Sequence, residues 1–157
     1  MDYERVAQEL ATNDSMKNWQ DISSVAIWLR QSGRCAYCRR DMLESFATAY
    51  HASCLDHLLP VSKYPEVHEA CNRVLACRAC NALKSDWDPN SSDPSSPPIY
   101  STGEIFTDAN HSVLLDRVRS YVMGKKMVRE VQFQSERELI LRKLSSLIEA
   151  DHSLAVK

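Results

Sequence analysis

The sequence contains no run of about 18 consecutive apolar residues, which a membrane-spanning helix would require. We therefore expect no membrane partner. A secretory signal is also lacking, because residues 1–5 are acidic and amphipathic, so we expect a cytoplasmic, intracellular protein. No internal repeat is visible, and the length of 157 residues predicts one domain of ordinary size with a small helical part appended.

An excess of positive charge is lacking as well, since the net charge at pH 7 is −2. That balance argues against indiscriminate binding of nucleic acid. The charge is unevenly distributed: residues 30–87 carry +2 and residues 117–143 carry +5, whereas residues 1–29 carry −3 and residues 88–116 carry −5. The basic block at 117–143 is either a solvated helix face or a surface that binds phosphate.

Six cysteines are present, and four of them form two C-x-x-C pairs, Cys35 with Cys38 and Cys77 with Cys80. In a reducing compartment this pattern favours a metal over disulfides. Each pair offers two thiolates from a tight turn, so the two pairs complete the tetrahedron of a structural Zn²⁺ ion. The separation between the pairs is longer than in a simple zinc ribbon, so the metal would clip together a structure built between them.

Cys54 and Cys71 stand outside these pairs. Neither has another cysteine two or three residues away, which makes a ligand role the weaker interpretation. We interpret both as buried apolar residues, because free cysteine packs like a small hydrophobic side chain.

Residues 1–32 are predicted to form N-terminal helices that act as packing elements. Apolar side chains recur at helical spacing over residues 2–12 and again from Trp19 to Leu29. Gly33 follows at the position where a left-handed helix end favours glycine.

Between the cysteine pairs, the residues predict a strand, a loop and a second strand inside a core at residues 33–88. The first strand covers residues 52–55, and Asp56 and His57 fall at its end. Pro60 then changes the chain direction, because proline fixes its own φ and restricts the residue before it.

The core closes with a return strand over residues 72–76 and a helix that begins at Cys80 and ends near Trp87. Residues 42–50 are ambiguous between a helical turn and a connection. The expected fold is therefore α+β and mostly helical, with further helices on the N- and C-terminal sides of the core.

Beyond the core we expect a linker and a helical extension. Residues 89–98 are rich in proline and serine and predict an exposed linker. In the extension, residues 99–157, a small hairpin is expected at 99–106. Two helices follow: one over residues 113–124 and one that begins at Ser135 with a capping-box pattern.

Asp56, His57 and Asn81 supply the groups that hydrolysis of a phosphodiester requires. An imidazole, whose ordinary pKa is about 6.5, can take a proton from water near neutral pH. A carboxylate and an amide oxygen suit a divalent cation such as Mg²⁺ or Mn²⁺, which neutralises the phosphate and the leaving alkoxide. Alone, Asp56 is more often a turn cap and His57 a core histidine, so the hypothesis depends on their combination.

The zinc-containing branch of the HNH endonuclease family has a similar order and spacing of residues, here the two cysteine pairs, Asp56, His57, Asn72, Asn81 and Lys84. The resemblance covers residues 30–88. It implies a ββα-metal core, also called a His-Me finger, pinned by a zinc site of four cysteines.

By this resemblance His57 is the general base, and Asp56 and Asn81 bind the catalytic Mg²⁺ or Mn²⁺. Asn72 holds the loop so that His57 is aimed correctly. Asn81 replaces the final histidine of the family name, so the sequence is an H-N-N variant, and its amide oxygen suits Mg²⁺ or Mn²⁺ better than Zn²⁺.

The resemblance implies a DNA endonuclease, a hydrolase that leaves 5′-phosphate and 3′-hydroxyl ends. A histidine base predicts that activity falls below about pH 6. The alternative is a zinc-knuckle module without catalytic activity that docks nucleic acid or a protein partner.

Basic side chains in two regions are candidates for contacts with DNA. Lys84 shares a helix face with Asn81 and is either a phosphate ligand or an ordinary surface lysine. Residues 110–150 are predicted to clamp the DNA backbone, to form a homodimer contact, or both. The expected phosphate ligands there are Lys125, Lys126 and Arg129, and the side chains expected to be buried are Leu139, Leu144, Leu147 and Ile148.

Overall fold

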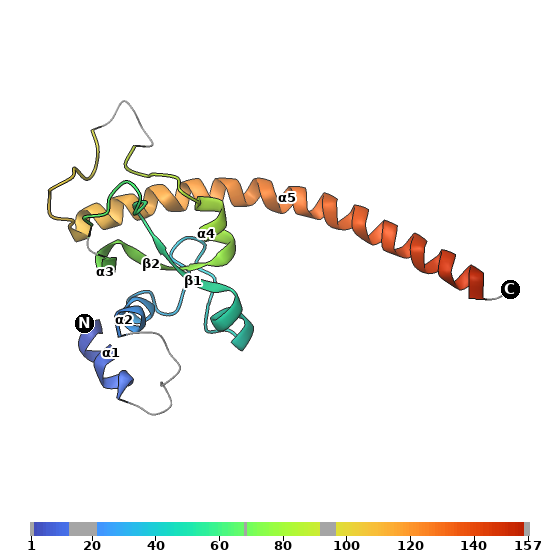
Figure 1. The fold of residues 1–157 in the computed structure, drawn as a ribbon, viewed down its shortest axis with the longest axis horizontal. Helices are drawn as coiled ribbons and strands as arrows, with labels where there is room; N and C mark the ends of the chain where they lie inside the picture. The colour runs from blue at the N-terminus through green and yellow to red at the C-terminus, as the bar shows by residue number, and fades with distance from the viewer. Residues whose placement is uncertain (1, 13–21, 68, 92–96, 156–157) are drawn as a thin grey trace. The chain divides into compact units, whose positions relative to one another are not determined.

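The computed structural model of the chain describes residues 2–12, 22–67, 69–91 and 97–155 (Figure 1). It combines helices with a small two-stranded antiparallel sheet, which confirms the expected α+β, mostly helical class. The chain divides into two compact units, Met1–Met123 and Gly124–Lys157. None of the helices within the described ranges is long and apolar enough to cross a membrane.

Two helices open the first unit, as the apolar spacing predicts. α1 spans Tyr3–Ala11, and the Asp2 carboxylate accepts a hydrogen bond from the backbone N–H of Arg5 at 3.0 Å, which caps the first turn. α2 spans Ile22–Arg30 and packs against α1. The start of the predicted second helix, before residue 22, lies outside the described ranges.

A tight left-handed turn follows α2. Gly33 has φ = 64°, and its N–H donates to the carbonyl oxygen of Trp28 at 2.9 Å. A Cβ at this position would lie 2.6 Å from Cδ1 of Leu43. The positive φ favours glycine here, and a Cβ would also force the exposed Leu43 side chain to move, which confirms the predicted role of Gly33.

The sheet pairs β1 (Ser53–His57) with β2 (Arg73–Cys77) in antiparallel register, with Leu55 opposite Leu75. The first strand therefore ends at His57, where the sequence predicts a change of direction. A single π-helical turn, η2 (Ala47–His51), precedes β1. The ambiguous segment before the strand is thus helical from Ala47 onward.

Short helices flank β2 on both sides. α3 (Glu69–Asn72) leads directly into the strand, and α4 (Arg78–Lys84) begins directly after it and packs against both strands. The order strand, strand, helix agrees with the prediction, but α4 ends at Lys84 rather than near Trp87. The reason is local: Ser85 adopts φ = 52°, which interrupts the helix.

The main core of the first unit lies between the sheet, α2 and the first turns of α5 (Asp108–Ala155). Val118 and Val122 of α5 are fully buried, and the ring of Tyr121 stacks on Trp87 at a centroid distance of 4.0 Å. Fully burying one such aliphatic side chain contributes about 1.5–3 kcal/mol. This packing fixes the start of α5 onto the elements that carry the candidate site.

Asn90 organises a smaller core cluster around Leu59, Tyr100 and Leu114. Its side chain accepts hydrogen bonds from the N–H groups of Ile99 and Tyr100, at 2.8 and 2.9 Å, and donates to the Tyr100 carbonyl oxygen at 2.7 Å. These bonds use the backbone groups that a hairpin would pair. The predicted hairpin at 99–106 is therefore wrong, although a turn does form at Gly103, where φ is 92°.

The predicted exposed linker is also partly wrong. Pro89 and Asn90, its first two residues, are buried. Arg117 donates to the carbonyl oxygen of Pro89 at 3.0 Å, which ties this stretch to α5. Residues 92–96 of the linker lie outside the described ranges.

The two helices predicted after residue 112 are one helix, α5. Gly124 does not end it, because one glycine inside a helix costs only about 1 kcal/mol and its neighbours are good helix formers. Ser135 does not begin a new helix either. Pairs of opposite charge four residues apart, such as Lys126 with Glu130 at 3.4 Å, favour the continuous helix.

Within the second unit, considered by itself, residues 124–147 carry no buried side chain. Leu139 is 69% exposed, and Leu144 and Leu147 are 49% and 55% exposed. The prediction that these side chains are buried is wrong for this single chain, while the side chain of Ile148 lies outside the description. A helical apolar stripe by itself does not supply the surface that would cover it.

Candidate metal centre and active site

The four paired cysteines converge on one point. The sulfur atoms of Cys35, Cys38, Cys77 and Cys80 all lie within 4.8 Å of one another. The Sγ atoms of Cys38 and Cys77 are 3.9 Å apart, close to the separation of about 3.8 Å that follows from tetrahedral geometry with Zn–S bonds of about 2.3 Å. All four are free thiols. This cluster could hold a zinc ion, as the sequence predicts.

The backbone around each pair explains the convergence. In the first knuckle, Cys35 donates its N–H to the Arg40 carbonyl oxygen at 2.9 Å, and Arg39 closes the turn with φ = 62°. In the second, Cys77 ends β2 and its sulfur accepts the N–H of Cys80 at 3.4 Å, which caps α4. The sequence thus places two sulfurs on a tight turn and two at a strand–helix junction.

The electrostatics of the cluster fit a cation. Hydrogen bonds from the neighbouring thiols, Cys35 first, hold the pKa of Cys38 well below its usual range, whereas bonds within the same cluster raise the pKa of Cys77 and Cys80. Without a cation, ionisation of one thiol therefore opposes ionisation of the others. A bound zinc ion would remove that opposition, because thiolates are its ligands.

The other two cysteines are not part of the cluster. Cys54 and Cys71 are half-buried rather than buried, which corrects the predicted burial. Cys54 lies on β1, where its thiol donates to the Ala76 carbonyl oxygen at 3.5 Å. Burial raises the pKa of the Cys54 thiol, and an interaction with the Asn81 side chain opposes that effect.

Asp56 is a buried carboxylate, 8% exposed, on β1. Its Oδ2 accepts a hydrogen bond from the Tyr37 hydroxyl at 2.6 Å, and its Oδ1 accepts the N–H of His57 at 2.8 Å. Burial raises the pKa of the Asp56 carboxyl, while Lys84 and these hydrogen bonds counteract the shift. Burial disfavours the charged form of this carboxylate, and a cation next to it offsets that cost.

Lys84 lies beside that carboxylate. Its Nζ is 3.7 Å from Oδ1 of Asp56, and its side chain is only 2% exposed. Burial lowers the pKa of the Lys84 ammonium, and Asp56 opposes the effect. The interpretation of Lys84 as an ordinary surface lysine is therefore wrong: the last turn of α4 carries it onto β1.

His57 is half-buried and is the last residue of β1. Successive strand residues point to opposite faces, so the imidazole and the Asp56 carboxylate leave the strand on different sides. The strand stops here, and the next N–H, that of Leu58, donates to the carbonyl oxygen of Asn72 at 2.9 Å.

Asn72 holds the loop directly after His57. Its Oδ1 accepts the N–H of Leu59 at 2.8 Å, and its Nδ2 donates to the Leu59 carbonyl oxygen at 2.9 Å. The residue is 1% exposed, so both bonds are shielded from water. The side chain therefore closes the loop at two points, while its effect on catalysis remains a prediction.

Asn81 lies on α4, three residues before Lys84, and is half-buried. It interacts with Cys54, which lies two residues before Asp56 and so on the same face of β1. Asn81, Lys84 and the Asp56 carboxylate are therefore neighbours where α4 packs on that face. Carboxylate and amide oxygens together fit a hard cation such as Mg²⁺ or Mn²⁺.

The three basic residues predicted to bind phosphate lie in the second unit, on α5. Lys125 and Arg129 are exposed and Lys126 is half-buried. Two of them are in ion pairs along the helix: Lys126 with Glu130 at 3.4 Å, and Arg129 with Glu136 at 3.8 Å. These weak, exposed pairs would not prevent contact with a phosphate.

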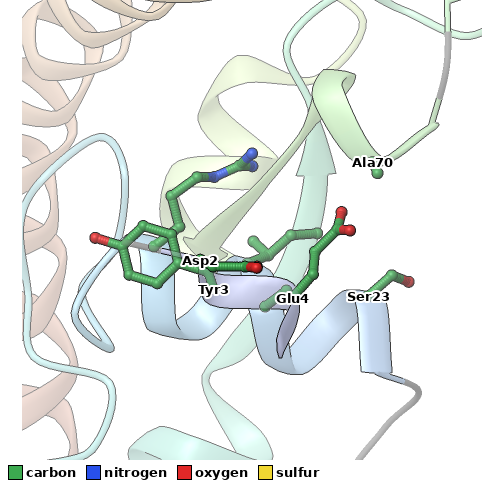
Figure 2. A pocket seen from close by; sticks show the side chains of 8 residues that line it. Asp2, Tyr3, Glu4, Ser23 and Ala70 are labelled. Atoms are coloured by element: carbon green, nitrogen blue, oxygen red, sulfur yellow. The ribbon is translucent and has the colours of Figure 1, made fainter. Parts of the chain in front are cut away.

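A pocket of about 230 Å³ is lined by none of the predicted site residues (Figure 2). It is lined by the start of α1, by α2 and by Ala70 of α3. Two of its polar residues serve the fold: Asp2 caps α1, and Arg30 donates to the carbonyl oxygen of Arg73 at 3.0 Å. The pocket therefore adds nothing to the candidate site.

One residue of the site was not predicted from the sequence. Tyr37 bonds to Asp56 from inside the first C-x-x-C pair, and its only signal was its position between two expected zinc ligands. The other predicted residues of the core lie on β1, α3, β2, α4 and the first knuckle. Neither a scan against protein-family models nor a search of curated proteins matches this chain.

Proposed function

We propose that the protein is a metal-dependent DNA endonuclease of the HNH type, with a structural Zn²⁺ ion at the four cysteines. The observation that carries the proposal is the buried carboxylate of Asp56 next to His57, with Asn72 closing the loop that follows. A buried carboxylate at the end of a strand, followed directly in the chain by a histidine, offers a metal ligand and a base within one short segment, and buried ionisable groups cluster at functional sites.

Asp56 and Asn81 would hold the catalytic Mg²⁺ or Mn²⁺. When bound, such a cation supplies positive charge to the phosphate and to the departing oxygen. The proposal is supported by the donor chemistry of the two side chains and by the contact of Asn81 with Cys54, which lies on the same face of β1 as Asp56. It also gives the desolvated Asp56 carboxylate a partner of higher charge than Lys84.

His57 would accept the proton of the attacking water. The hydrogen bonds of Asn72 to Leu59 keep the loop after His57 in one conformation, which limits how far the imidazole can drift from the reacting atoms. The resulting hydroxide attacks phosphorus, the bond to the 3′-oxygen breaks, and that oxygen takes a proton from solvent water to become the hydroxyl. By the family resemblance the products are a 5′-phosphate and a 3′-hydroxyl.

DNA is the proposed substrate, and contacts with its backbone are assigned to the basic part of α5. Lys84, which the sequence offered as a phosphate ligand, is 2% exposed and paired with Asp56, so its assigned role is to balance the charge of that carboxylate. One such site cuts one strand, so cleavage of both strands would require two copies or two encounters. The exposed apolar side chains of the second unit, such as Leu139 and Leu144, are consistent with a homodimer contact.

The proposal is tested by plasmid cleavage with Mg²⁺ or Mn²⁺, comparing the wild type with His57→Ala. We expect loss of a factor of about 10² or more in the variant, the range for a missing general base. His51→Ala is a matched control, because His51 is an exposed histidine of η2 outside the site. Equal cleavage by the wild type and His57→Ala would show that His57 is not the base.

A second candidate function is a zinc-stabilised binding module without catalysis. The observation in its favour is the ion pair between Asp56 and Lys84, which already gives the carboxylate a partner. Binding of DNA in a gel-shift assay, with no cleavage under Mg²⁺, Mn²⁺ or other divalent metals, would favour this candidate over the nuclease.

A further inference from the structure

We propose that Tyr37 is a positioning residue that connects the zinc knuckle to the catalytic carboxylate. This inference rests on the proposed function, since it assigns Asp56 to the catalytic metal. Tyr37 lies between Cys35 and Cys38, so its backbone belongs to the turn that presents two of the four sulfurs. Its hydroxyl reaches out of that turn to Asp56.

The hydrogen bond between Tyr37 and Asp56 is short and shielded from water. The Tyr37 hydroxyl is 2.6 Å from Oδ2 of Asp56, Tyr37 is 3% exposed, and Asp56 is 8% exposed. Hydrogen bonds to an ionised acceptor are stronger than neutral ones, and burial strengthens them further. With Oδ2 held by the phenol and Oδ1 by the N–H of His57, the carboxylate has one orientation.

The knuckle that carries Tyr37 is itself fixed from two sides. The N–H of Ala36 donates to the carbonyl oxygen of Leu75 on β2 at 2.8 Å. Arg119 of α5 donates its Nε–H to the carbonyl oxygen of Ala36 at 2.7 Å. Ala36, the residue before Tyr37, is therefore bonded to both the sheet and α5. These bonds fix the backbone from which the Tyr37 side chain extends.

Two effects follow from this arrangement. The zinc cluster acts on the active site through a specific hydrogen bond in addition to its effect on stability. The phenol also acts on the metal only through Asp56, as outer partners of metal ligands do. Removal of such partners typically lowers metal affinity or activity by about 10–100-fold.

The test compares zinc-loaded wild type with Tyr37→Phe, which deletes only the hydroxyl. Mn²⁺ affinity is measured by titration calorimetry and by electron paramagnetic resonance. Only the Mn²⁺ ion that Asp56→Ala no longer binds is counted as the ion of the candidate site. Zinc content and the melting temperature are measured on the same samples. We expect Mn²⁺ affinity and cleavage rate to fall about 10–100-fold in Tyr37→Phe, with one zinc ion per chain retained.

Tyr64→Phe is the matched control. The Tyr64 hydroxyl also donates to a buried carboxylate, Oδ2 of Asp88 at 3.1 Å, but it lies outside the candidate site. We expect Mn²⁺ affinity and cleavage in this control to equal those of the wild type. A similar loss in both variants would show a general effect of removing a buried hydroxyl, and would overturn the inference.

The remaining outcomes are separable. If the wild type cleaves DNA and Tyr37→Phe binds Mn²⁺ as tightly as the wild type, the inference is overturned but the proposed function stands. Loss of zinc from Tyr37→Phe also overturns it, because the tyrosine would then be a structural part of the zinc site. A wild type that neither binds Mn²⁺ through Asp56 nor cleaves DNA overturns the proposed function, and the inference with it.

Discussion

Similar apolar side chains are buried in one unit of the chain and exposed in the other. In Met1–Met123, apolar side chains of α5 such as Val118 and Val122 are fully buried in one core with the sheet and the cysteine pairs. In Gly124–Lys157, the described apolar side chains of the same helix, including Leu139 and Leu144, are exposed. Burial therefore follows from the presence of a facing element, and helical spacing of apolar residues does not guarantee one.

The comparison also separates two sources of order. The first unit is held by its core, by buried polar clamps such as Asn72 and Asn90, and by four cysteines suited to zinc. The second is a helix with ion pairs along its surface, and such pairs are worth only about 0.3–0.5 kcal/mol each. Perturbations of the first unit should therefore be severe, whereas those of the second should be mild.

The largest expected effect is loss of zinc. Cys38→Ser should remove the ion and abolish cooperative melting of the first unit, because structural zinc binding contributes about 10 kcal/mol or more to folding. Zinc content and melting temperature are measured together. Cys54→Ser is the matched control, since Cys54 is a free thiol outside the cluster. A Cys38→Ser protein with full zinc and normal melting would contradict the metal assignment.

Core truncation comes next and compares the units directly. Leu75→Ala should lower the free energy of unfolding by about 2–5 kcal/mol, because Leu75 is fully buried. Leu139→Ala, at a 69% exposed position, should change it by less than about 0.5 kcal/mol. Chemical denaturation measures both. A large loss in Leu139→Ala would mean that a partner, such as a second copy, covers this face.

A smaller effect is expected for the loop clamp. Asn72→Ala removes two buried hydrogen bonds to Leu59 and should cost about 1–3 kcal/mol of stability. If the clamp also aims His57, the cleavage rate should fall under conditions where the variant is fully folded. Unchanged cleavage by the folded variant would restrict Asn72 to a structural role.

How far the sequence predicted the structure depends on the range of the interactions. The cysteine cluster and Gly33 were predictable, because metal chemistry and a left-handed turn each require particular residue types. Asp56 and His57 at the end of β1 were predictable from the proline that follows. In each of these cases the decisive information is local.

The rest depends on tertiary contacts that no local pattern encodes. Lys84 is buried because α4 packs on β1, where Asp56, far earlier in the chain, lies within ion-pair distance. The predicted hairpin at 99–106 does not form, because the N–H groups of Ile99 and Tyr100 donate to the side chain of Asn90. The predicted helix end at Gly124 is absent, because the cost of about 1 kcal/mol for one glycine is too small to end a long helix.

The smallest effect on stability is expected in the basic part of the second unit. Changing Lys125, Lys126 and Arg129 to Ala should leave zinc content and melting unchanged but weaken DNA binding. Each lost phosphate contact should flatten the salt dependence of binding by about 0.9 in log–log slope. Binding is measured over a range of salt concentrations. A slope equal to wild type would show that this surface is only a solvated helix face.

We propose that this chain hydrolyses phosphodiester bonds, and the chemical nature of the ends of cleaved DNA tests this proposal. Plasmid is incubated with zinc-loaded protein and Mg²⁺ or Mn²⁺, and the ends are mapped by labelling and by resealing with a DNA ligase. We expect 5′-phosphate and 3′-hydroxyl ends that ligase reseals, formed about 10²-fold or more slowly by His57→Ala. Absence of cleavage with every metal, or ends that carry a 3′-phosphate, would contradict it.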